Sequence, residues 1–252
     1  MAIITLASDY GTQDGYPAAV KGVLKTLSPQ SEIMDITHRL SSISKTALVL
    51  LRYYLEFPLG TVHLVVIDPT VGSSRRAMAG QSGGRFFVGP DNGIFTKITD
   101  EAPNSEWVEI DPANLPSRPI SPTFHGRDIF APAAALLANG VDLVTLGRPI
   151  KDPVRLSIPR PSREPGKIVG EIIDIDSFGN LIINIPGNDL GSRPKVVLER
   201  NEIAFARSFA EVDRGSPLAY IGSLGYLEIA VNMGRASEYF VVTVGSKVVV
   251  EL

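Results

Sequence analysis

Three acidic residues in the first half of the chain follow apolar segments that read as strands. Asp9, Asp35 and Asp68 each occupy such a position. In open α/β sheets, ligands bind outside the carboxyl ends of the strands, so three acids at one edge can face one crevice. For a single acid, a structural role at a strand end or helix cap is the better explanation. For three acids, followed by YGTQDG, ITH and PTVGSSRR, we favour a site.

The loop after the third apolar segment pairs an acid with a cation. Asp68 and Arg75 flank the sequence PTVGSS and can close on each other across it. A structural ion pair that pins the loop is an equally good explanation from the residues alone. Asp9 suits a sugar diol, because the two oxygens of a carboxylate can accept hydrogen bonds from two vicinal hydroxyls. Other polyols fit equally well.

A histidine in TFHGRDIF, residues 123–130, is a further candidate. His125 stands beside Gly126, just before a predicted helix. A glycine beside an imidazole leaves room for a small molecule such as water. The alternative is a polar loop residue near a helix cap.

The second half offers groups suited to a nucleobase. In DIDSFGNLIIN, Phe178 can stack on a base and Asn180 can both donate to and accept from its edge. The alternative is a β-turn with a core phenylalanine. The glycines around Ser223 permit either close approach of a ligand or a tight hairpin.

Several chemistries are excluded or disfavoured. The chain has no cysteine, which excludes disulfides, thiolate zinc sites and a cysteine nucleophile. His38, His63 and His125 lie far apart, and we read His63 as an ordinary packed residue. The phosphate-loop, dinucleotide-binding and nucleophile-elbow signatures are missing. We therefore expect no metal and no cofactor.

Charge and hydropathy indicate no nucleic-acid or membrane partner. The 252 residues carry a net charge of −3, which gives no basic footprint for nucleic acid. No apolar run approaches the roughly 20 residues that a membrane span needs. The N-terminus lacks the features of a signal peptide, so we expect a cytoplasmic protein.

The pattern of elements predicts two different halves. Strands and helices alternate over residues 1–150, which predicts an α/β domain with a largely parallel sheet flanked by helices. Residues 151–166 are rich in proline and charge and look like a linker. Residues 167–252 read as strands between turns, which predicts a smaller antiparallel β-sandwich or barrel domain.

Taken in order, seven stretches resemble the S-adenosylmethionine hydroxide adenosyltransferase family, which is related to the bacterial fluorinase and chlorinase. They cover nearly the whole chain: LASDYGTQDG, DITH, VVIDPTVGSSRR, VGPDNG, TFHGRD, IDSFGN and GSLGYLEIAVNMG. The family has the same two-domain architecture. Its Asp-Arg-His triad falls on Asp68, Arg75 and His125, and the resemblance implies that the three converge on one water.

The resemblance also implies roles for substrate-binding residues. Asp9 would hold the ribose hydroxyls, and Asp14 and Ser223 would lie near the methionine end. Phe178 and Asn180 would lie near the adenine. Two further acids, Asp176 and Glu228, would contact the methionine amine, and Glu228 is alternatively only a strand residue.

The implied activity is hydrolysis of S-adenosylmethionine to adenosine and methionine by water or hydroxide at C5′. Val71 and Gly126 stand where the fluorinase has a threonine and a serine that donate to fluoride, and neither side chain here can hydrogen-bond a halide. Within the triad that the resemblance implies, His125 oriented by Asp68 is slightly favoured as the base, and direct stabilisation of hydroxide by Arg75 is the alternative.

Two other functions stay open: an adenosyl-ligand binding protein without turnover, and a halogenase. The resemblance also implies a homotrimer, with ligand between the N-terminal domain of one subunit and the C-terminal domain of its neighbour.

Overall fold

The computed structural model describes residues 1–102, 104–191 and 194–252. It divides into two compact units, Met1–Leu156 and Ser157–Leu252, here called unit 1 and unit 2. The segment expected to be a linker, 151–166, is divided between them.

Unit 1 contains a mixed sheet whose strand order among the described residues is β2-β1-β3-β5-β4-β6-β7. The pairs β2–β1, β1–β3 and β3–β5 are parallel, and β4, β6 and β7 add antiparallel pairs at one side. The strands are β1 (Ile3–Ser8), β2 (Glu32–Thr37), β3 (Val62–Val66), β4 (Ala77–Ser82), β5 (Arg85–Pro90), β6 (Glu106–Ile110) and β7 (Gly147–Pro149).

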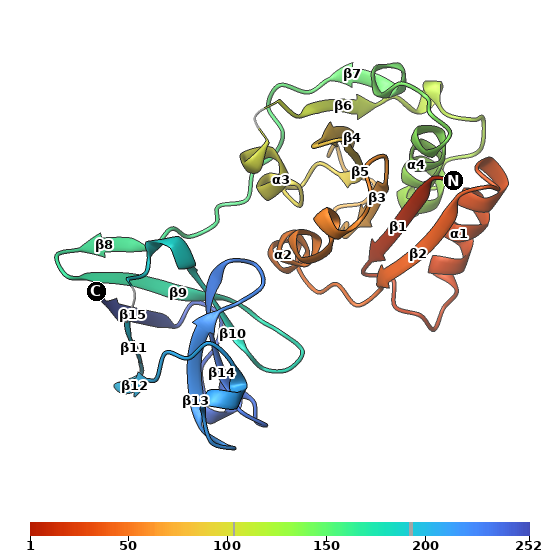
Figure 1. The fold of residues 1–252 in the computed structure, drawn as a ribbon. Helices are drawn as coiled ribbons and strands as arrows, with labels where there is room; N and C mark the ends of the chain where they lie inside the picture. The colour runs from red at the N-terminus through yellow and green to blue at the C-terminus, as the bar shows by residue number, and fades with distance from the viewer. Residues whose placement is uncertain (103, 192–193) are drawn as a thin grey trace. The chain divides into compact units, whose positions relative to one another are not determined.

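Helices cover both faces of this sheet. Helices α1 and α4 pack in the core on one face, and α2 and α3 pack in the core on the other (Figure 1). Burial on both faces explains why every residue of β3 is buried. The helices are α1 (Tyr16–Leu27), α2 (Ile43–Tyr53), α3 (Thr96–Glu101) and α4 (Ala131–Ala138), with short turns η1 (Tyr54–Glu56), η2 (Pro112–Asn114), η3 (Gly126–Phe130) and η4 (Leu143–Leu146).

Local sequence explains where these helices begin and end. The hydroxyl of Ser42 accepts the backbone N–H of Lys45 and caps the start of α2. Gly140, with φ of 84°, follows the C-terminal end of α4 in the left-handed conformation that glycine favours. The five-residue π-helix η3 precedes α4, and His125 lies immediately before it.

Unit 2 is an antiparallel sheet that nearly closes into a barrel, with strand order β12-β11-β15-β9-β10-β14-β13 among the described residues, β8 also pairing with β9. Backbone hydrogen bonds of Ala204 and Ala206 with Ala219 place the segment after β12 beside β13. These bonds narrow the gap between the two edge strands of the sheet, β12 and β13. Its elements are β8 (Ser162–Glu164), β9 (Lys167–Ile175), β10 (Leu181–Pro186), η5 (Gly187–Asp189), β11 (Lys195–Leu198), β12 (Asn201–Ile203), η6 (Phe209–Glu211), β13 (Pro217–Ile221), β14 (Tyr226–Val231), α5 (Ala236–Tyr239) and β15 (Lys247–Glu251).

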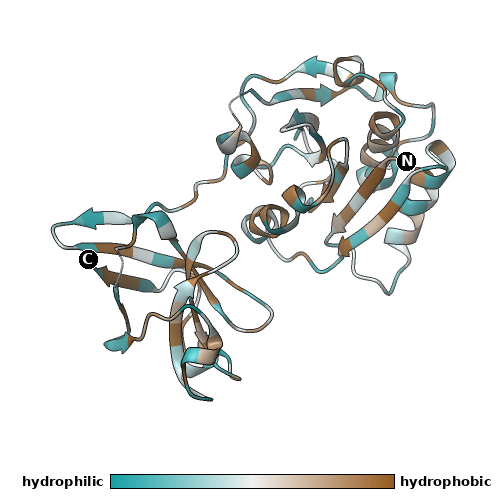
Figure 2. Ribbon diagram, in the orientation of Figure 1, coloured by the Kyte–Doolittle hydropathy of each residue, from teal (hydrophilic) through white to brown (hydrophobic). Residues whose placement is uncertain are grey.

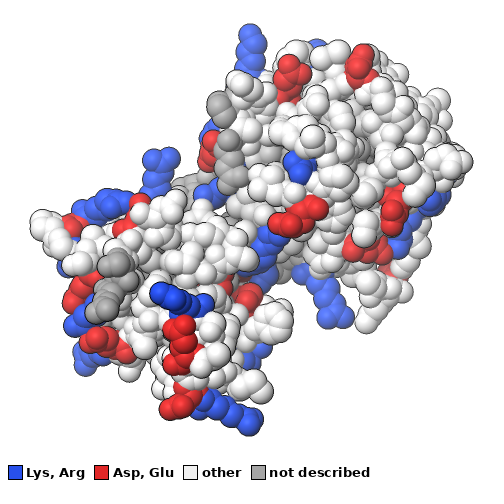
Figure 3. Space-filling view, in the orientation of Figure 1, with Lys and Arg blue, Asp and Glu red and all other residues white. Residues whose placement is uncertain are grey.

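The predicted fold class is confirmed in both units. Hydrophobic residues concentrate on β1 and α4 in unit 1 (Figure 2). Strand β9 of unit 2 alternates half-buried and buried positions. Lys, Arg, Asp and Glu are interspersed on the face shown in Figure 3. No helix in the described part of the chain has the length and apolar character needed to cross a membrane.

Candidate active site

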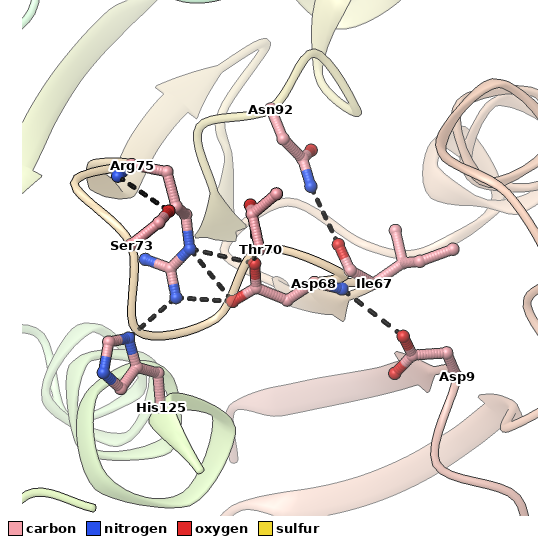
Figure 4. Close-up of polar contacts among 8 residues, drawn as sticks. All are labelled: Asp9, Ile67, Asp68, Thr70, Ser73, Arg75, Asn92 and His125. Carbon is pink, nitrogen blue, oxygen red and sulfur yellow. Dashed lines mark hydrogen bonds and ion pairs between the residues drawn. The ribbon is translucent and has the colours of Figure 1, made fainter. Parts of the chain in front are cut away.

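Two acids meet at the carboxyl ends of the neighbouring parallel strands β1 and β3. The backbone N–H of Asp9 donates to the carbonyl of Val66 at 3.2 Å. The backbone N–H of Asp68 in turn donates to the carboxylate of Asp9 at 3.4 Å (Figure 4). The topology thus brings together two residues that are 59 positions apart in the chain.

Asp68 holds the guanidinium of Arg75 by a double contact. Nε of Arg75 donates to the two carboxylate oxygens at 2.9 and 3.0 Å, and Nη2 makes a further short contact to Oδ2. The two side chains are only 7% and 8% exposed. Charge-assisted contacts of this kind fix both position and orientation, so the loop closes as predicted.

Arg75 also contacts His125. Its Nη2 lies 2.7 Å from Nδ1 of the imidazole. A guanidinium only donates hydrogen bonds, so Nδ1 accepts and the proton of a neutral His125 sits on Nε2. The expectation that Asp68 orients His125 is therefore wrong, because Arg75 lies between the two (Figure 4).

Part of the Arg75 guanidinium remains available to a ligand. Nε and Nη2 make its hydrogen bonds, whereas Nη1 makes none with the described residues. The ring of Phe130 lies 5.1 Å from Cζ and holds the planar group from another side. Two N–H groups on Nη1 are thus presented by a fixed cation.

Burial and nearby charges shift two pKa values at this cluster. Burial, and then the charge of Arg75, lowers the pKa of His125, against smaller opposing effects of Asp68 and Asp128. His125 is therefore neutral at pH 7, as its bond from Arg75 requires. Loss of hydration raises the pKa of Asp9, and the charge of Asp68 adds to this, while the N–H of Asp68 opposes it.

Further residues support the loop that carries Asp68. The side-chain amide of Asn92 donates to the carbonyl of Ile67 at 2.8 Å, directly before Asp68. The hydroxyl of Ser73 accepts the backbone N–H of Arg75 at 3.3 Å. Asn92 lies in the stretch VGPDNG, where the residue types alone gave it no role at the site. Its position two residues after β5, at the same edge of the sheet, was the available signal.

Asp35 does not join this cluster, contrary to expectation. It lies inside β2, and its carboxylate pairs with Lys21 at 2.8 Å and with Nε2 of His38 at 3.2 Å. Nδ1 of His38 is 2.7 Å from the hydroxyl of Ser8, the residue before Asp9. Asp35 and His38 thus support the backbone behind Asp9 and do not face the same ligand.

The remaining charged residues of the motifs differ in their surroundings. Asp14 is exposed and makes no hydrogen bond or ion pair with the described residues. Arg76 binds the buried Asp91 at 2.7 Å and Asp152 at 2.8 Å. It therefore ties residues near the end of unit 1 to the sheet, which is a structural role.

In unit 2, Asp176 organises the turn between β9 and β10. Its carboxylate accepts the backbone N–H groups of Phe178 and Asn180, both at 2.9 Å, and the side-chain amide of Asn180 at 3.0 Å. This pattern is an Asx-type turn. The structure thus gives Asp176 a positioning role within the turn.

The same turn presents an aromatic face and an amide beside a hollow. Phe178 is 73% exposed, which is unusual for so large an apolar side chain. Phe178 and Asn180 line a hollow of about 600 Å³ with Phe209, Val231, Asn232, Met233, Gly234 and Arg235. A hollow of this size, with one flat apolar face and amide groups, suits a nucleobase.

The last two predicted residues lie around the β13–β14 turn. Ser223 is exposed in that turn. The carboxylate of Glu228 is buried and accepts the hydroxyl of Tyr220 at 2.7 Å. A side chain at Gly222 would meet Glu228 Oε1 at 2.0 Å, so this acid packs tightly against the turn.

The unit 1 cluster can orient and polarise an oxygen nucleophile. Arg75 offers cationic N–H donors, and His125 offers an N–H at Nε2. The carboxylates of Asp68 and Asp9 offer acceptors. The described residues include no group of three or more His, Cys, Asp or Glu side chains arranged to hold a metal ion.

Fold and site define a protein that joins a doubly covered α/β unit, with an acid–guanidinium–imidazole cluster at its strand ends, to an antiparallel β unit. Residues 4–147 match the model of the SAM hydroxide adenosyltransferase N-terminal domain, and residues 170–249 match that of the C-terminal domain. The chain belongs to the SAM hydroxide adenosyltransferase family.

Named relatives and a solved structure agree with this assignment. The chain is 36% identical to the (R)-S-adenosyl-L-methionine hydrolase of Salinispora tropica, covering 97% of this chain and 95% of the relative. It is 38% identical to the Thermus thermophilus protein of the same name, covering 94% and 95%. A crystal structure of an uncharacterized conserved protein from Thermotoga maritima superposes with a TM-score of 0.90 at 37% identity, covering all of both chains.

Proposed function

We propose that this chain hydrolyses S-adenosyl-L-methionine to adenosine and L-methionine by direct attack of water or hydroxide at C5′. Two relatives, 36% and 38% identical over 97% and 94% of this chain, are named for hydrolysis of this compound. The observation that carries the proposal is the fixed position of Arg75 between Asp68 and His125, with Nη1 unused.

In the proposed mechanism, Asp68 and His125 hold Arg75 so that its free N–H groups stabilise the attacking oxygen. The bond between this oxygen and C5′ forms while the bond between C5′ and sulfur breaks, and the sulfur of methionine keeps the electron pair. The proton of the water passes to the Asp68 carboxylate and then to solvent. Nδ1 of His125 is occupied by Arg75 and Nε2 carries a proton, so a base role for His125 is disfavoured.

The typical sizes of catalytic effects indicate that orientation of the reactants and stabilisation of charge contribute most to the rate of the proposed reaction. Alignment of oxygen, C5′ and sulfur can contribute about 7–11 kcal/mol in well-oriented reactions. Removing one preorganised donor to a developing anion typically lowers kcat by about 10²–10³. Sulfonium is already a good leaving group, so the site needs no acid to expel it.

We propose that the nucleophile is water or hydroxide and not a halide. Val71 and Gly126 replace the two donors that the fluorinase uses for fluoride. Fluoride bound beside them would lose hydration without a hydrogen bond from either of these two side chains in return. The positively charged Arg75 and the neutral His125 match a developing hydroxide.

For the rest of the substrate, the roles of the remaining residues stay predictions. Asp9 would accept the ribose hydroxyls, and Phe178 and Asn180 would take the adenine in the unit 2 hollow. Ser223, Asp14, Asp176 and Glu228 would lie toward methionine. In this proposal Asp176 acts through the turn that it organises.

The assembly and location expected from the sequence also stay predictions. We propose a homotrimer in which unit 1 of one subunit and unit 2 of its neighbour complete each site. A measured solution mass of three chains would support this, and a monomer with full activity would contradict it. A cytoplasmic location is the corresponding prediction for the cell.

Product analysis tests the activity. The protein is incubated with S-adenosyl-L-methionine, alone and with fluoride or chloride, and the products are separated by chromatography. Equal amounts of adenosine and methionine are expected in every case, and loss of both in Arg75→Ala. Retained ligand without release of adenosine would indicate a binding protein, and 5′-halo-adenosine would indicate a halogenase.

A further inference from the structure

Tyr10 and Gly126 make an unusually close approach beside the site. Tyr10 directly follows Asp9, and Gly126 directly follows His125. A Cβ atom built on Gly126 would lie 1.9 Å from the hydroxyl oxygen of Tyr10 and 3.0 Å from its Cζ. Real Cβ atoms essentially never come within 3.0 Å of another heavy atom. Position 126 therefore cannot carry a side chain while Tyr10 keeps this place.

The backbone conformation does not explain the glycine. Gly126 has no positive φ, and it lies in the π-helix η3, where other residues are equally allowed. Packing against Tyr10 is thus the reason for glycine here. The expected empty space beside His125 is instead filled by the hydroxyl of Tyr10, which corrects the sequence-based interpretation of Gly126.

The ring of Tyr10 is fixed from several sides. Its centroid lies 5.7 Å from that of Phe124 in an edge-to-face contact, and 6.2 Å from that of Tyr16. On either side along the chain, the backbone N–H of Gly11 donates to the carbonyl of His38 at 2.8 Å, and Asp9 bonds to Val66. The hydroxyl therefore has a defined position.

This hydroxyl lies in the electrostatic field of the site. Burial is the largest cause that raises the pKa of Tyr10, and the charges of Asp9 and Asp68 add to it, whereas Arg75 opposes it. The group is therefore a protonated O–H at neutral pH. The hydroxyl makes no hydrogen bond with the described residues, so its donor is available to a ligand.

We propose that Tyr10 is a further specificity-determining residue of the nucleophile pocket. Its hydroxyl takes the volume of a side chain at position 126 and hydrogen-bonds the attacking oxygen. The inference rests on the proposed hydrolysis, since the nucleophile is that of the proposed reaction. Tyr10 thereby supplies a side-chain hydroxyl from unit 1, which Gly126 lacks.

A double-mutant cycle tests whether the Tyr10 hydroxyl occupies the volume of a side chain at position 126, and it needs no assay of activity. Gly126→Ala should lower the melting temperature in the parent chain, because the new methyl group meets the Tyr10 hydroxyl. In a Tyr10→Phe background the oxygen is gone and the nearest ring atom, Cζ, lies 3.0 Å from the new methyl group, so the clash is relieved in large part and the loss should be at least halved. Equal losses in the two backgrounds would overturn the proposed packing.

Turnover tests the contact to the nucleophile. Tyr10→Phe should lower kcat by about 10²-fold with little change in KM, as expected for loss of one donor to the reacting oxygen. Tyr16→Phe is the matched control, because this partly exposed hydroxyl belongs to the same aromatic cluster, and it should keep parent kcat. Parent kcat in Tyr10→Phe would overturn the proposal. If the parent chain forms no adenosine, the proposed function is refuted. The double-mutant cycle would still test the packing of Tyr10 against position 126, because it measures melting temperatures only.

Discussion

Nη2 of Arg75 contacts both the carboxylate of Asp68 and, at 2.7 Å, Nδ1 of His125. One guanidinium thereby connects two residues that share no hydrogen bond or ion pair with each other, and it fixes the tautomer of the imidazole. The arrangement makes Arg75 the centre of the cluster and gives Asp68 and His125 the task of holding it.

Arg75→Lys should therefore nearly abolish turnover. An ammonium is a point charge that cannot reproduce the double contact to Asp68 and the bond to His125 at once. We expect kcat to fall by about 10³-fold or more. The free energy of unfolding should fall less than in Arg75→Ala, since burying Asp68 without any cation costs about 3–5 kcal/mol. Turnover and urea unfolding of both variants check this, and a lysine variant with near-parent kcat would refute the central role.

His125 predicts how activity depends on pH. Its lowered pKa keeps Nδ1 free to accept from Arg75 at neutral pH, and protonation in acid removes that acceptor and adds a second cation. The kcat should thus decline only below about pH 6.5, the ordinary histidine pKa.

Two substitutions of His125 distinguish its role as a hydrogen-bond acceptor for Arg75 from the effect of protonating its imidazole. His125→Asn retains an oxygen acceptor for Arg75, so it should keep more activity than His125→Ala and should lose the acid limb of the profile. Profiles of kcat for the three proteins are the measurement. The same acid limb in His125→Asn would mean that another group titrates.

Arg76 should matter for stability and not for chemistry. It binds Asp91, whose side chain is fully buried, so Arg76→Ala leaves an acid in the interior without its cation. The expected loss is about 3 kcal/mol of unfolding free energy. Below the lowered melting temperature, kcat should stay at the parent value. A large fall in kcat of the folded variant would contradict the structural role.

The buried His63 should make folding sensitive to acid. Burial is the main cause that lowers the pKa of His63 to about 3, so the folded chain holds it neutral. The unfolded chain takes up a proton near pH 6.5, so stability is full above that pH and declines as pH falls toward 3. Between pH 6.5 and 4.5 this group should remove about 2–3 kcal/mol.

Urea unfolding at the two pH values measures this loss in the parent chain and in His63→Phe. The variant replaces the imidazole within a cluster of aromatic rings that includes Tyr53, Phe57 and Phe87. Its pH dependence should be smaller by the stated amount, whatever its stability at neutral pH. An unchanged pH dependence would assign acid sensitivity to other groups.

Much of this fold follows from sequence patterns. Alternating apolar strands and helices predicted the α/β unit because local periodicity reports which face is buried, as in the continuously buried β3. Strand ends also predicted that Asp9 and Asp68 meet, since parallel neighbours share one edge. Asp35 failed this argument because it lies within β2 and has nearer partners in Lys21 and His38.

Other features depend on contacts that no local pattern encodes. The choice between Asp68 and Arg75 as the partner of His125 is decided by side-chain positions across 50 residues of sequence. The space beside Gly126 is likewise decided by Tyr10, which is more than one hundred residues away in the chain. An interpretation of single residues can identify His125 and Gly126 as candidates, but it does not predict which side chains they contact.

The most direct test of the account is hydrolysis in water enriched with oxygen-18. Attack at C5′ by an oxygen that Arg75 stabilises predicts one labelled oxygen in adenosine, at the 5′ position, and none in methionine. Mass spectrometry of the two products reads this out. Adenosine without the label would show that the bond from solvent oxygen to C5′ never forms, which would contradict the mechanism.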